Sequence, residues 1–238
     1  MSIMYHHVNS DAFSNKLEIF EEHLRYIKAH FTPVVTGDEI SGKCVCLTFD
    51  DAYADFYFLV YPLLKKYQIK AMLAVSSKYV LEDSRQAPQK RMGIPHHELF
   101  DRYKEGTCCT FKEMEEMIAS NLVKIASHSH THANLADKNT DLTTELKTSK
   151  AILEERLKVE VDSLILPYGK HNKEVLKEAK KYYRYVFRIG NALHKDFTGI
   201  GGLTYRVNGD ELKRPDEIFR TKNLLKYYAK GLLKRIAS

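Results

Sequence analysis

The chain has 238 residues, of which 44% are hydrophobic, and its formal net charge is +6 at pH 7. The length predicts one large domain or two small ones, and the hydrophobic share predicts a real core. The modest positive charge does not by itself indicate a nucleic-acid-binding protein. No run of about eighteen apolar residues occurs, which argues against a transmembrane helix.

The cysteines and the first residues indicate the compartment. Cys44, Cys46, Cys108 and Cys109 have neither zinc-finger nor C-x-x-C spacing, and no disulfide framework is visible. A reducing environment is therefore predicted. The first seven residues lack the basic start and apolar region of a signal peptide. We expect a cytoplasmic protein.

Segments with helical and strand-like patterns alternate from the N-terminus. Apolar residues recur at steps of three and four over 15–31, which predicts an amphipathic helix. The apolar run over 44–49 predicts a buried strand, and 71–75 predicts another. Between them, 54–67 predicts a helix that kinks or begins late at Pro62.

The middle of the chain departs from this rhythm. Residues 81–108 are polar and mixed, which predicts an insertion or long loop, with a short helix at 97–103. A capping-box pattern, Thr110 with Glu113, then predicts the start of a helix. After it the expected elements are strands at 122–126, 163–166, 185–189 and 203–207, and helices at 141–159 and 173–182.

This alternation predicts an α/β protein with a parallel sheet. Polar or turn residues follow the ends of four predicted strands: His6, the pair Asp50-Asp51, His128 and the Pro167-Tyr168-Gly169 turn. In a closed parallel barrel these ends share one face, and that face carries the active site. We therefore favour a barrel over an open sheet.

Two adjacent carboxylates at the end of a buried strand are costly unless a cation or metal neutralises them. His128 and His132 are spaced suitably for binding a transition metal. His130, between them, is expected to point away from the metal, either against the ligand residues or into solvent. The alternatives are a chance histidine pair, and a solvated turn or helix N-cap for Asp50-Asp51. If the site is real, one aspartate binds the metal and the other serves as a base.

Three stretches together resemble a known family, in order and spacing. They are Thr48-Phe49-Asp50-Asp51, Ser127-His128-Ser129-x-x-His132 and Leu166-Pro167-Tyr168-Gly169. They are similar to the first three motifs of the polysaccharide deacetylase family, also called the NodB-homology or carbohydrate esterase 4 group. Tyr5-His6-x-Val8 looks like the circularly permuted branch that deacetylates poly-N-acetylglucosamine. The resemblance covers about residues 3–209 and implies a distorted (β/α)7 barrel related to the TIM barrel.

The resemblance also implies roles for individual residues. A divalent metal, usually zinc, with cobalt, nickel or iron as alternatives, would be held by Asp51, His128 and His132. Asp50 would be the general base and His6 the general acid. The backbone N–H of Tyr168 would help to stabilise the tetrahedral oxyanion.

The chain departs from the family pattern in three places. Ile165 stands where many members have an arginine that orients the catalytic aspartate, so Arg188 or Arg206 is expected to replace it. The tryptophan of the fourth motif cannot exist, because the chain has no tryptophan. The later leucine-x-histidine motif is only mimicked by Leu193-His194, which makes His194 an alternative general acid to His6.

The function implied by the resemblance is removal of an N-acetyl group from an amino sugar in the biosynthesis of a surface glycan, such as lipopolysaccharide or capsule. For a cytoplasmic enzyme the expected substrate is a nucleotide-linked or lipid-linked sugar. The alternatives are a deformylase and a catalytically inactive glycan-binding barrel, although binding alone would not need Asp50. A nucleic-acid or phosphoester hydrolase is disfavoured, because a second set of metal carboxylates is missing.

The end of the chain is predicted to be separate from the barrel of residues 1–221. Residues 222–238 contain lysines and one arginine, no acid, and leucines at helical spacing. Such a basic amphipathic helix suits a peripheral contact with the inner face of a membrane. The alternative is a helix packed on the barrel with a solvated lysine face.

Overall fold

Seven parallel strands close into a barrel in the computed structural model, which describes residues 1–236. Their order around the barrel is β1, β10, β9, β8, β7, β6, β5, and β5 pairs back with β1. The predicted distorted (β/α)7 barrel is confirmed. The barrel strands are β1 (Ser2–Tyr5), β5 (Cys44–Phe49), β6 (Ala71–Val75), β7 (Val123–Ser127), β8 (Ser163–Ile165), β9 (Tyr185–Ile189) and β10 (Thr204–Asn208).

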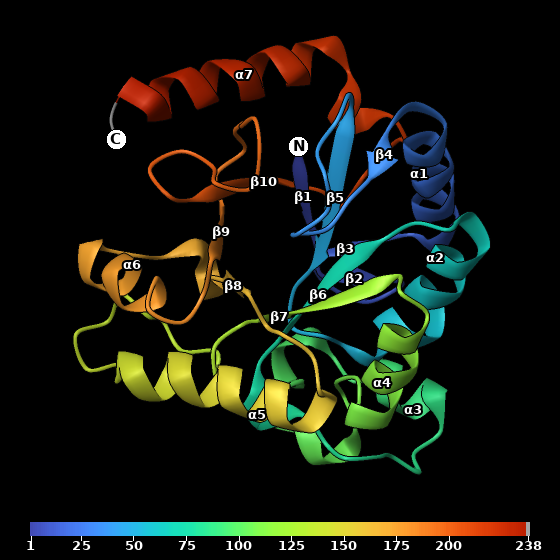
Figure 1. The fold of residues 1–238 in the computed structure, drawn as a ribbon. Helices are drawn as coiled ribbons and strands as arrows, with labels where there is room; N and C mark the ends of the chain where they lie inside the picture. Colours follow the sequence, from blue (N-terminus) through green and yellow to red (C-terminus); the bar gives the residue numbers. More distant parts are fainter. Residues whose placement is uncertain (237–238) are drawn as a thin grey trace.

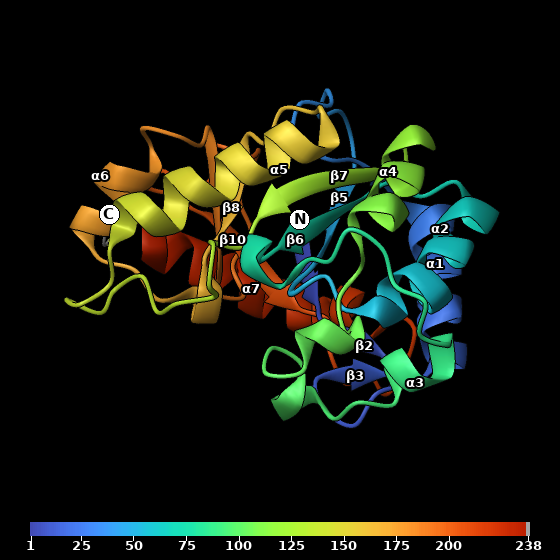
Figure 2. The same ribbon diagram turned by 90° about the horizontal axis from the view of Figure 1, so that it is seen from below.

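Helices surround the barrel and lie in the connections between its strands, except for the last helix, which lies across one end of the barrel (Figures 1 and 2). They are α1 (Leu17–His30), α2 (Tyr61–Tyr67), α3 (Pro88–Met92), α4 (Phe111–Ala119), α5 (Ser149–Leu157), α6 (Lys173–Ala179) and α7 (Thr221–Ile236). Three short strands complete the fold: β2 (His7–Val8), β3 (Ser14–Asn15) and β4 (Thr32–Pro33). Within residues 1–236, none of the helices has the length and apolar character needed to cross a bilayer.

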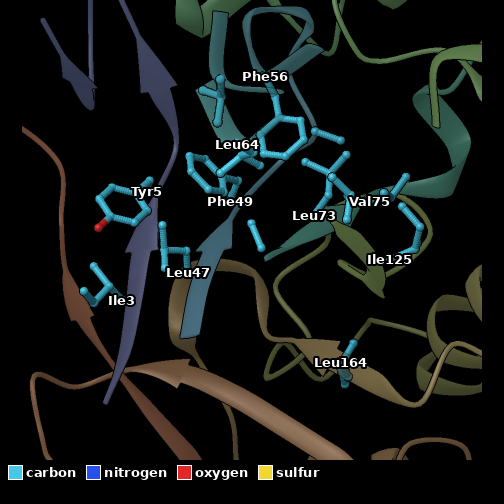
Figure 3. Packing of buried hydrophobic residues seen from close by; sticks show 14 of the residues in the cluster. Ile3, Tyr5, Leu47, Phe49, Phe56, Leu64, Leu73, Val75, Ile125 and Leu164 are labelled. Atoms are coloured by element: carbon cyan, nitrogen blue, oxygen red, sulfur yellow. The ribbon is translucent and has the colours of Figure 1, made fainter. Parts of the chain in front are cut away.

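The alternation of side chains along each strand divides the core into two layers. Residues such as Tyr5, Phe49 and Leu73 pack between the strands and the surrounding helices, as Figure 3 shows. Their strand neighbours, such as Cys46, Met72 and Ala126, fill the inside of the barrel. The barrel interior is therefore largely packed with apolar side chains, and the buried Arg206 is a charged exception among them.

The helices confirm the predicted pattern with local differences. Thr110 accepts a hydrogen bond from the backbone N–H of Glu113, and the Glu113 carboxylate accepts one from the N–H of Thr110, so the predicted capping box is formed. The predicted helix over 54–67 is divided. A wider π-helical turn over Phe56–Val60 continues directly into α2, and Pro62, the second residue of α2, has no N–H to donate to that preceding turn.

The insertion at 81–108 differs more from expectation. The short helix predicted at 97–103 is wrong. Two single 3-10 turns, His96–Glu98 and Tyr103–Glu105, occupy this stretch, and the helix of the segment is α3, which Pro88 begins. Arg91 of α3 is buried and donates to the carbonyls of Gly106 and Cys108 and to the Glu113 carboxylate. The insertion is thereby attached to the barrel as an ordered segment.

Candidate active site

The ends of five barrel strands bring polar side chains to one cavity of about 420 Å³. His6 follows β1, Asp50 and Asp51 follow β5, and His128 follows β7. The 3-10 turn Pro167–Gly169 follows β8, and Asp210 follows β10. Because all seven strands are parallel, these positions share the carboxyl end of the barrel, where the sequence predicted the active site.

Three side chains in this cavity form a candidate metal site. The ligand atoms of Asp51, His128 and His132 all lie within 4.8 Å of one another. Oδ1 of Asp51 is 3.5 Å from Nε2 of His128 and 3.2 Å from Nε2 of His132, and it is buried without a hydrogen-bond partner. A buried carboxylate oxygen facing two imidazole nitrogens needs a cation to compensate its charge. The three predicted ligands therefore fit a divalent metal.

The two imidazoles are held so that Nε2 of each faces Asp51. Nδ1 of His128 donates to the carbonyl of Ile165 at 2.7 Å, and Nδ1 of His132 lies 3.1 Å from the Tyr168 hydroxyl. Such a partner on Nδ1 leaves the lone pair on Nε2 for a metal. Burial lowers the pKa of His132 to about 4, despite the opposite effect of Asp51, so the ring is neutral, as a ligand must be.

The backbone around the ligands is tightly turned. Asp51, Ser129 and His132 all have φ between 57° and 67°, in the left-handed region that such residues seldom adopt. Glu145 holds the loop over 128–132 in place, because its carboxylate accepts hydrogen bonds from the backbone N–H groups of His130 and Thr131. His128 and His132 are thus brought together by a loop that is hydrogen-bonded to Glu145, and not by a helical turn.

Asp50 is held by the arginine that the sequence suggested. Arg206, fully buried inside the barrel, donates to both carboxylate oxygens of Asp50, at 2.5 and 2.8 Å, and to the Thr48 hydroxyl at 2.9 Å. Burial alone would raise the pKa of Asp50, but the guanidinium lowers it to about 2. Asp50 is therefore ionised. Arg188 lies elsewhere, 3.1 Å from His171.

His6 is paired with a carboxylate that sequence reasoning missed. Nδ1 of His6 is 2.7 Å from Asp210 Oδ2, and the backbone N–H of His6 donates to Asp210 Oδ1. Burial alone would lower the pKa of His6, but the hydrogen bond to Asp210 and the charge of Asp50 raise it to about 9. Gly209 permits this approach, because a Cβ there would lie 2.4 Å from the Tyr5 ring. The only sequence signal for this role of Asp210 was its position just after the last predicted strand.

The remaining predicted residues are divided between the site and other places. Tyr168 lines the cavity, with φ of 57° in its turn and a largely exposed ring. His130 bonds to Ser77 outside the cavity. His194 accompanies Met1 and Cys44 at the opposite end of the barrel, so the alternative assignment of His194 as general acid is wrong. The cause is the loop after β9, which runs back along the barrel before β10.

A family model for polysaccharide deacetylases matches residues 37–186 of the chain. The chain belongs to the polysaccharide deacetylase family. The resemblance stated from the three motifs is thereby confirmed, and the match includes all three predicted metal ligands together with Asp50 and Tyr168.

This deacetylase-family chain is similar to longer curated proteins. It is 28% identical to Bacillus subtilis YxkH over 194 residues, which are 75% of this chain and 60% of that protein. It is 36% identical to the Escherichia coli poly-beta-1,6-N-acetyl-D-glucosamine N-deacetylase over 92 residues, 39% of this chain and 12% of that protein. It is 26% identical to the Staphylococcus aureus enzyme of the same name over 180 residues, which are 68% of this chain and 56% of that protein. The chain thus spans about 60% or less of each.

Two solved structures share the fold of this deacetylase-family chain. The Streptococcus pyogenes deacetylase PplD, determined in complex with acetate, superposes with a TM-score of 0.72 at 23% identity, covering 95% of this chain and 96% of that one. IcaB from Ammonifex degensii superposes with a TM-score of 0.68 at 18% identity, covering 88% and 91%. At these identities the comparison supports the barrel and not a particular substrate.

The pairing of His6 with Asp210 predicts a pH-dependent stability. A pKa raised from 6.5 to about 9 means that the interaction is fully present below pH 6.5 and is lost as the pH rises through 9. In metal-free protein, Asp210→Asn should lower the free energy of unfolding by up to about 3 kcal/mol below pH 6.5, and by progressively less toward pH 9.

Denaturant unfolding across this pH range and NMR titration of the His6 ring measure the effect. Asp196→Asn removes a carboxylate at the other end of the barrel and is the control. A His6 pKa that is equal in the parent and Asp210→Asn would contradict the assignment.

Proposed function

We propose that this chain is a metal-dependent hydrolase that removes the N-acetyl group of an amino sugar during the biosynthesis of a surface glycan, such as lipopolysaccharide or capsule. One observation carries the proposal. An ionised carboxylate, Asp50, and a protonated imidazole, His6, lie beside the three candidate ligands, with 3.9 Å between Oδ2 of Asp50 and Nε2 of His6. A base and an acid at one cation site are what amide hydrolysis requires.

The metal would be held by Asp51, His128 and His132. Two imidazoles and one carboxylate form a three-ligand set of the kind that catalytic zinc sites use, and cobalt, nickel and iron accept the same donors. When bound, such a cation polarises the amide carbonyl and lowers the pKa of water. Since Asp50 is a weak base with a pKa of about 2, it depends on an acidified water to accept a proton readily.

The protein groups then divide the proton transfers. Asp50 takes a proton from the attacking water, while Arg206 fixes the direction of its oxygens. His6 carries a proton on Nε2, because Asp210 occupies Nδ1, and gives it to the nitrogen of the leaving amine as the C–N bond breaks. The backbone N–H of Tyr168, in the turn beside the ligands, is proposed to donate to the developing oxyanion.

The proposed substrate is an N-acetylated sugar or a sugar carrier. The Escherichia coli and Staphylococcus aureus relatives are named for poly-beta-1,6-N-acetyl-D-glucosamine, which supports an N-acetylglucosamine unit at the reacting position. A glycan-binding barrel without catalysis is disfavoured by Asp50. A buried carboxylate aligned by a buried arginine costs desolvation energy that binding alone would not require.

The activity prediction uses zinc-loaded protein and a tetramer of β-1,6-linked N-acetylglucosamine, with nucleotide-linked and lipid-linked N-acetylglucosamine as further substrates. The parent should release acetate from at least one of them. Asp50→Asn should lower kcat by about a hundredfold or more, because it removes the base while its shape is kept.

Asp196→Asn, which lies outside the cavity, should retain the parent rate. Release of formate from an N-formyl sugar, with no acetate from any acetyl substrate, would favour the deformylase instead. Absence of both products from the metal-loaded parent would contradict the proposal.

We also propose that α7 contacts a membrane, on its cytoplasmic side. Five large apolar side chains of α7 are exposed: Leu225, Tyr228, Leu232, Leu233 and Ile236. They fall on one side of the helix, whereas Gly231 is buried against Leu193 on the other side. Since single exposed apolar residues are normal but a contiguous row is not, this face is suited to an apolar partner.

The charges of α7 favour an anionic membrane over another protein as that partner. The helix has no acidic residue, and the exposed Lys222 and Lys226 lie within and beside the apolar row. Lys234 is directed inward, over the Tyr205 ring. Figure 1 shows α7 across the end of the barrel at which β1 and β5 begin, so the active site would face away from the membrane. All four cysteines are free thiols, which suits the cytoplasmic side.

Substitution of Leu225 and Leu233 by aspartate in the full chain tests this contact. Because two apolar side chains would lose their burial in lipid, sedimentation with phosphatidylglycerol vesicles should weaken by about tenfold or more. Phe13→Asp, which changes an exposed apolar residue elsewhere, should bind the vesicles like the parent. Equal binding of the α7 variant and the parent, or equal binding to anionic and zwitterionic vesicles, would exclude the contact.

A further inference from the structure

Beside the proposed catalytic groups, Asp55, His7 and His96 contact one another in series, and His96 lies at the cavity wall. Nδ1 of His7 lies 3.3 Å from Asp55 Oδ1, and Nε2 of His7 lies 3.1 Å from Nδ1 of His96. Asp55 and His7 are buried, and the His7 ring is stacked on Tyr53 with 3.9 Å between ring centroids. His96 belongs to the insertion at 81–108 and lines the same cavity as His6 and Asp50.

The order of these contacts favours one position of the proton on each ring. Oδ1 of Asp55 is buried without a hydrogen-bond partner, 3.3 Å from Nδ1 of His7, and because a carboxylate oxygen repels a ring lone pair this contact favours a proton on Nδ1. With the proton of His7 on Nδ1 alone, Nε2 of His7 is an acceptor, and the 3.1 Å bond is donated by Nδ1–H of His96. A neutral His96 is left with a lone pair on Nε2. Burial lowers the pKa of His96, which agrees with a neutral ring.

The free nitrogen of His96 has no counterpart in the protein. Among residues 1–236, no hydrogen bond or ion pair engages Nε2 of His96. Its other ring contacts are edge contacts with Phe13, His7 and Tyr53. His7, Asp55 and His96 do not form a second metal centre. Within the described residues, only Asp51, His128 and His132 bring three possible ligand atoms close together. An acceptor fixed at a cavity wall is suited to a ligand that donates.

We infer that His96 binds the substrate, by accepting a hydrogen bond on Nε2 from a hydroxyl group of the sugar, and that Asp55 fixes this acceptor through His7. The inference rests on the proposed function, since it assigns a contact of the same substrate. A lone pair would repel a phosphate oxygen, so the group bound here is a sugar hydroxyl and not the phosphate of a carrier.

Phe13 supplies the apolar surface that a sugar ring would cover. Its side chain is half exposed and lines the cavity between His6 and His96, with ring centroids 5.5 and 4.9 Å away. An apolar wall with one well-placed polar atom is the usual composition of a small-molecule site, because the wall gives affinity and the polar atom gives orientation. The insertion thus has a role in positioning the sugar relative to His6.

The test combines kinetics with the protonation of His96. His96→Phe keeps a ring of similar size, and His97→Phe is the matched control, because the adjacent His97 side chain is 77% exposed and outside the cavity. On the β-1,6-linked N-acetylglucosamine tetramer, His96→Phe should raise KM by about tenfold with kcat within about twofold of the parent, since one hydrogen bond is lost. His97→Phe should match the parent. Unchanged KM in His96→Phe would overturn the inference.

Nitrogen-15 NMR of histidine-labelled parent protein gives a readout that a merely structural role would not move. We expect Nδ1 of His96 to carry the proton and Nε2 to be unprotonated, and the Nε2 resonance to shift when the tetramer binds. Asp55→Asn, which can donate as well as accept, should abolish the single tautomer, with thermal melting as the check on folding. A protonated Nε2, or an unshifted resonance in saturated protein, would contradict the inference.

These results separate the inference from the proposed function. A parent that binds the tetramer and shifts the His96 resonance without releasing acetate would refute the hydrolase and retain the binding role. A parent that releases acetate while His96→Phe behaves as the parent would retain the hydrolase and refute the binding role.

Discussion

The ion pair between Arg206 and Asp50 is the constraint on which the rest of the site depends. Arg206 is fully buried inside the barrel, and its guanidinium reaches from β10 past β1 to Asp50 and Thr48 of β5. Breaking such a pair would leave an uncompensated buried charge, which typically costs 3–5 kcal/mol. The pair therefore links the strands that flank β1, the strand that presents His6.

Neighbours of opposite charge explain why the pKa values of two titratable groups in one cavity differ so strongly. Asp50 has a guanidinium as its nearest partner, and its pKa falls to about 2. His6 has the Asp210 carboxylate as its nearest partner, and its pKa rises to about 9. Each group is thus kept charged across neutral pH by a neighbour of opposite charge. Neighbours that move two pKa values apart are a common way to assign a base and an acid within one active site.

The sequence predicted what local patterns and recognisable motifs can encode. Hydrophobic periodicity located the barrel strands and most helices, and the three motifs led to the ligand residues and the family. The sequence did not indicate that Asp210 pairs with His6, and it left Arg188 and Arg206 as equal candidates for the arginine that orients Asp50. Asp210 meets His6 from 204 positions away, and Arg206 meets Asp50 from 156 positions away. Such contacts depend on the closure of the barrel, which leaves no local signature.

The insertion at 81–108 also could not be placed from local sequence patterns. Its mixed composition predicted a loop, and the position of His96 at the cavity depends on distant contacts, such as that of its backbone N–H with Asp11. His194 was considered because it follows a leucine, yet the loop after β9 carries it to the far end of the barrel. A residue type beside a motif fragment is therefore weaker evidence than a position at the end of a strand.

The central claim is that Asp51, His128 and His132 hold a metal, and metal content tests it most directly. Purified protein should contain about one equivalent of zinc or another transition metal by mass spectrometry. His128→Ala should lose it, and His130→Ala, which changes a histidine of the same loop outside the cluster, should retain it. A parent that stays metal-free after incubation with zinc, cobalt or nickel, or a His128→Ala variant that binds as the parent does, would contradict the account.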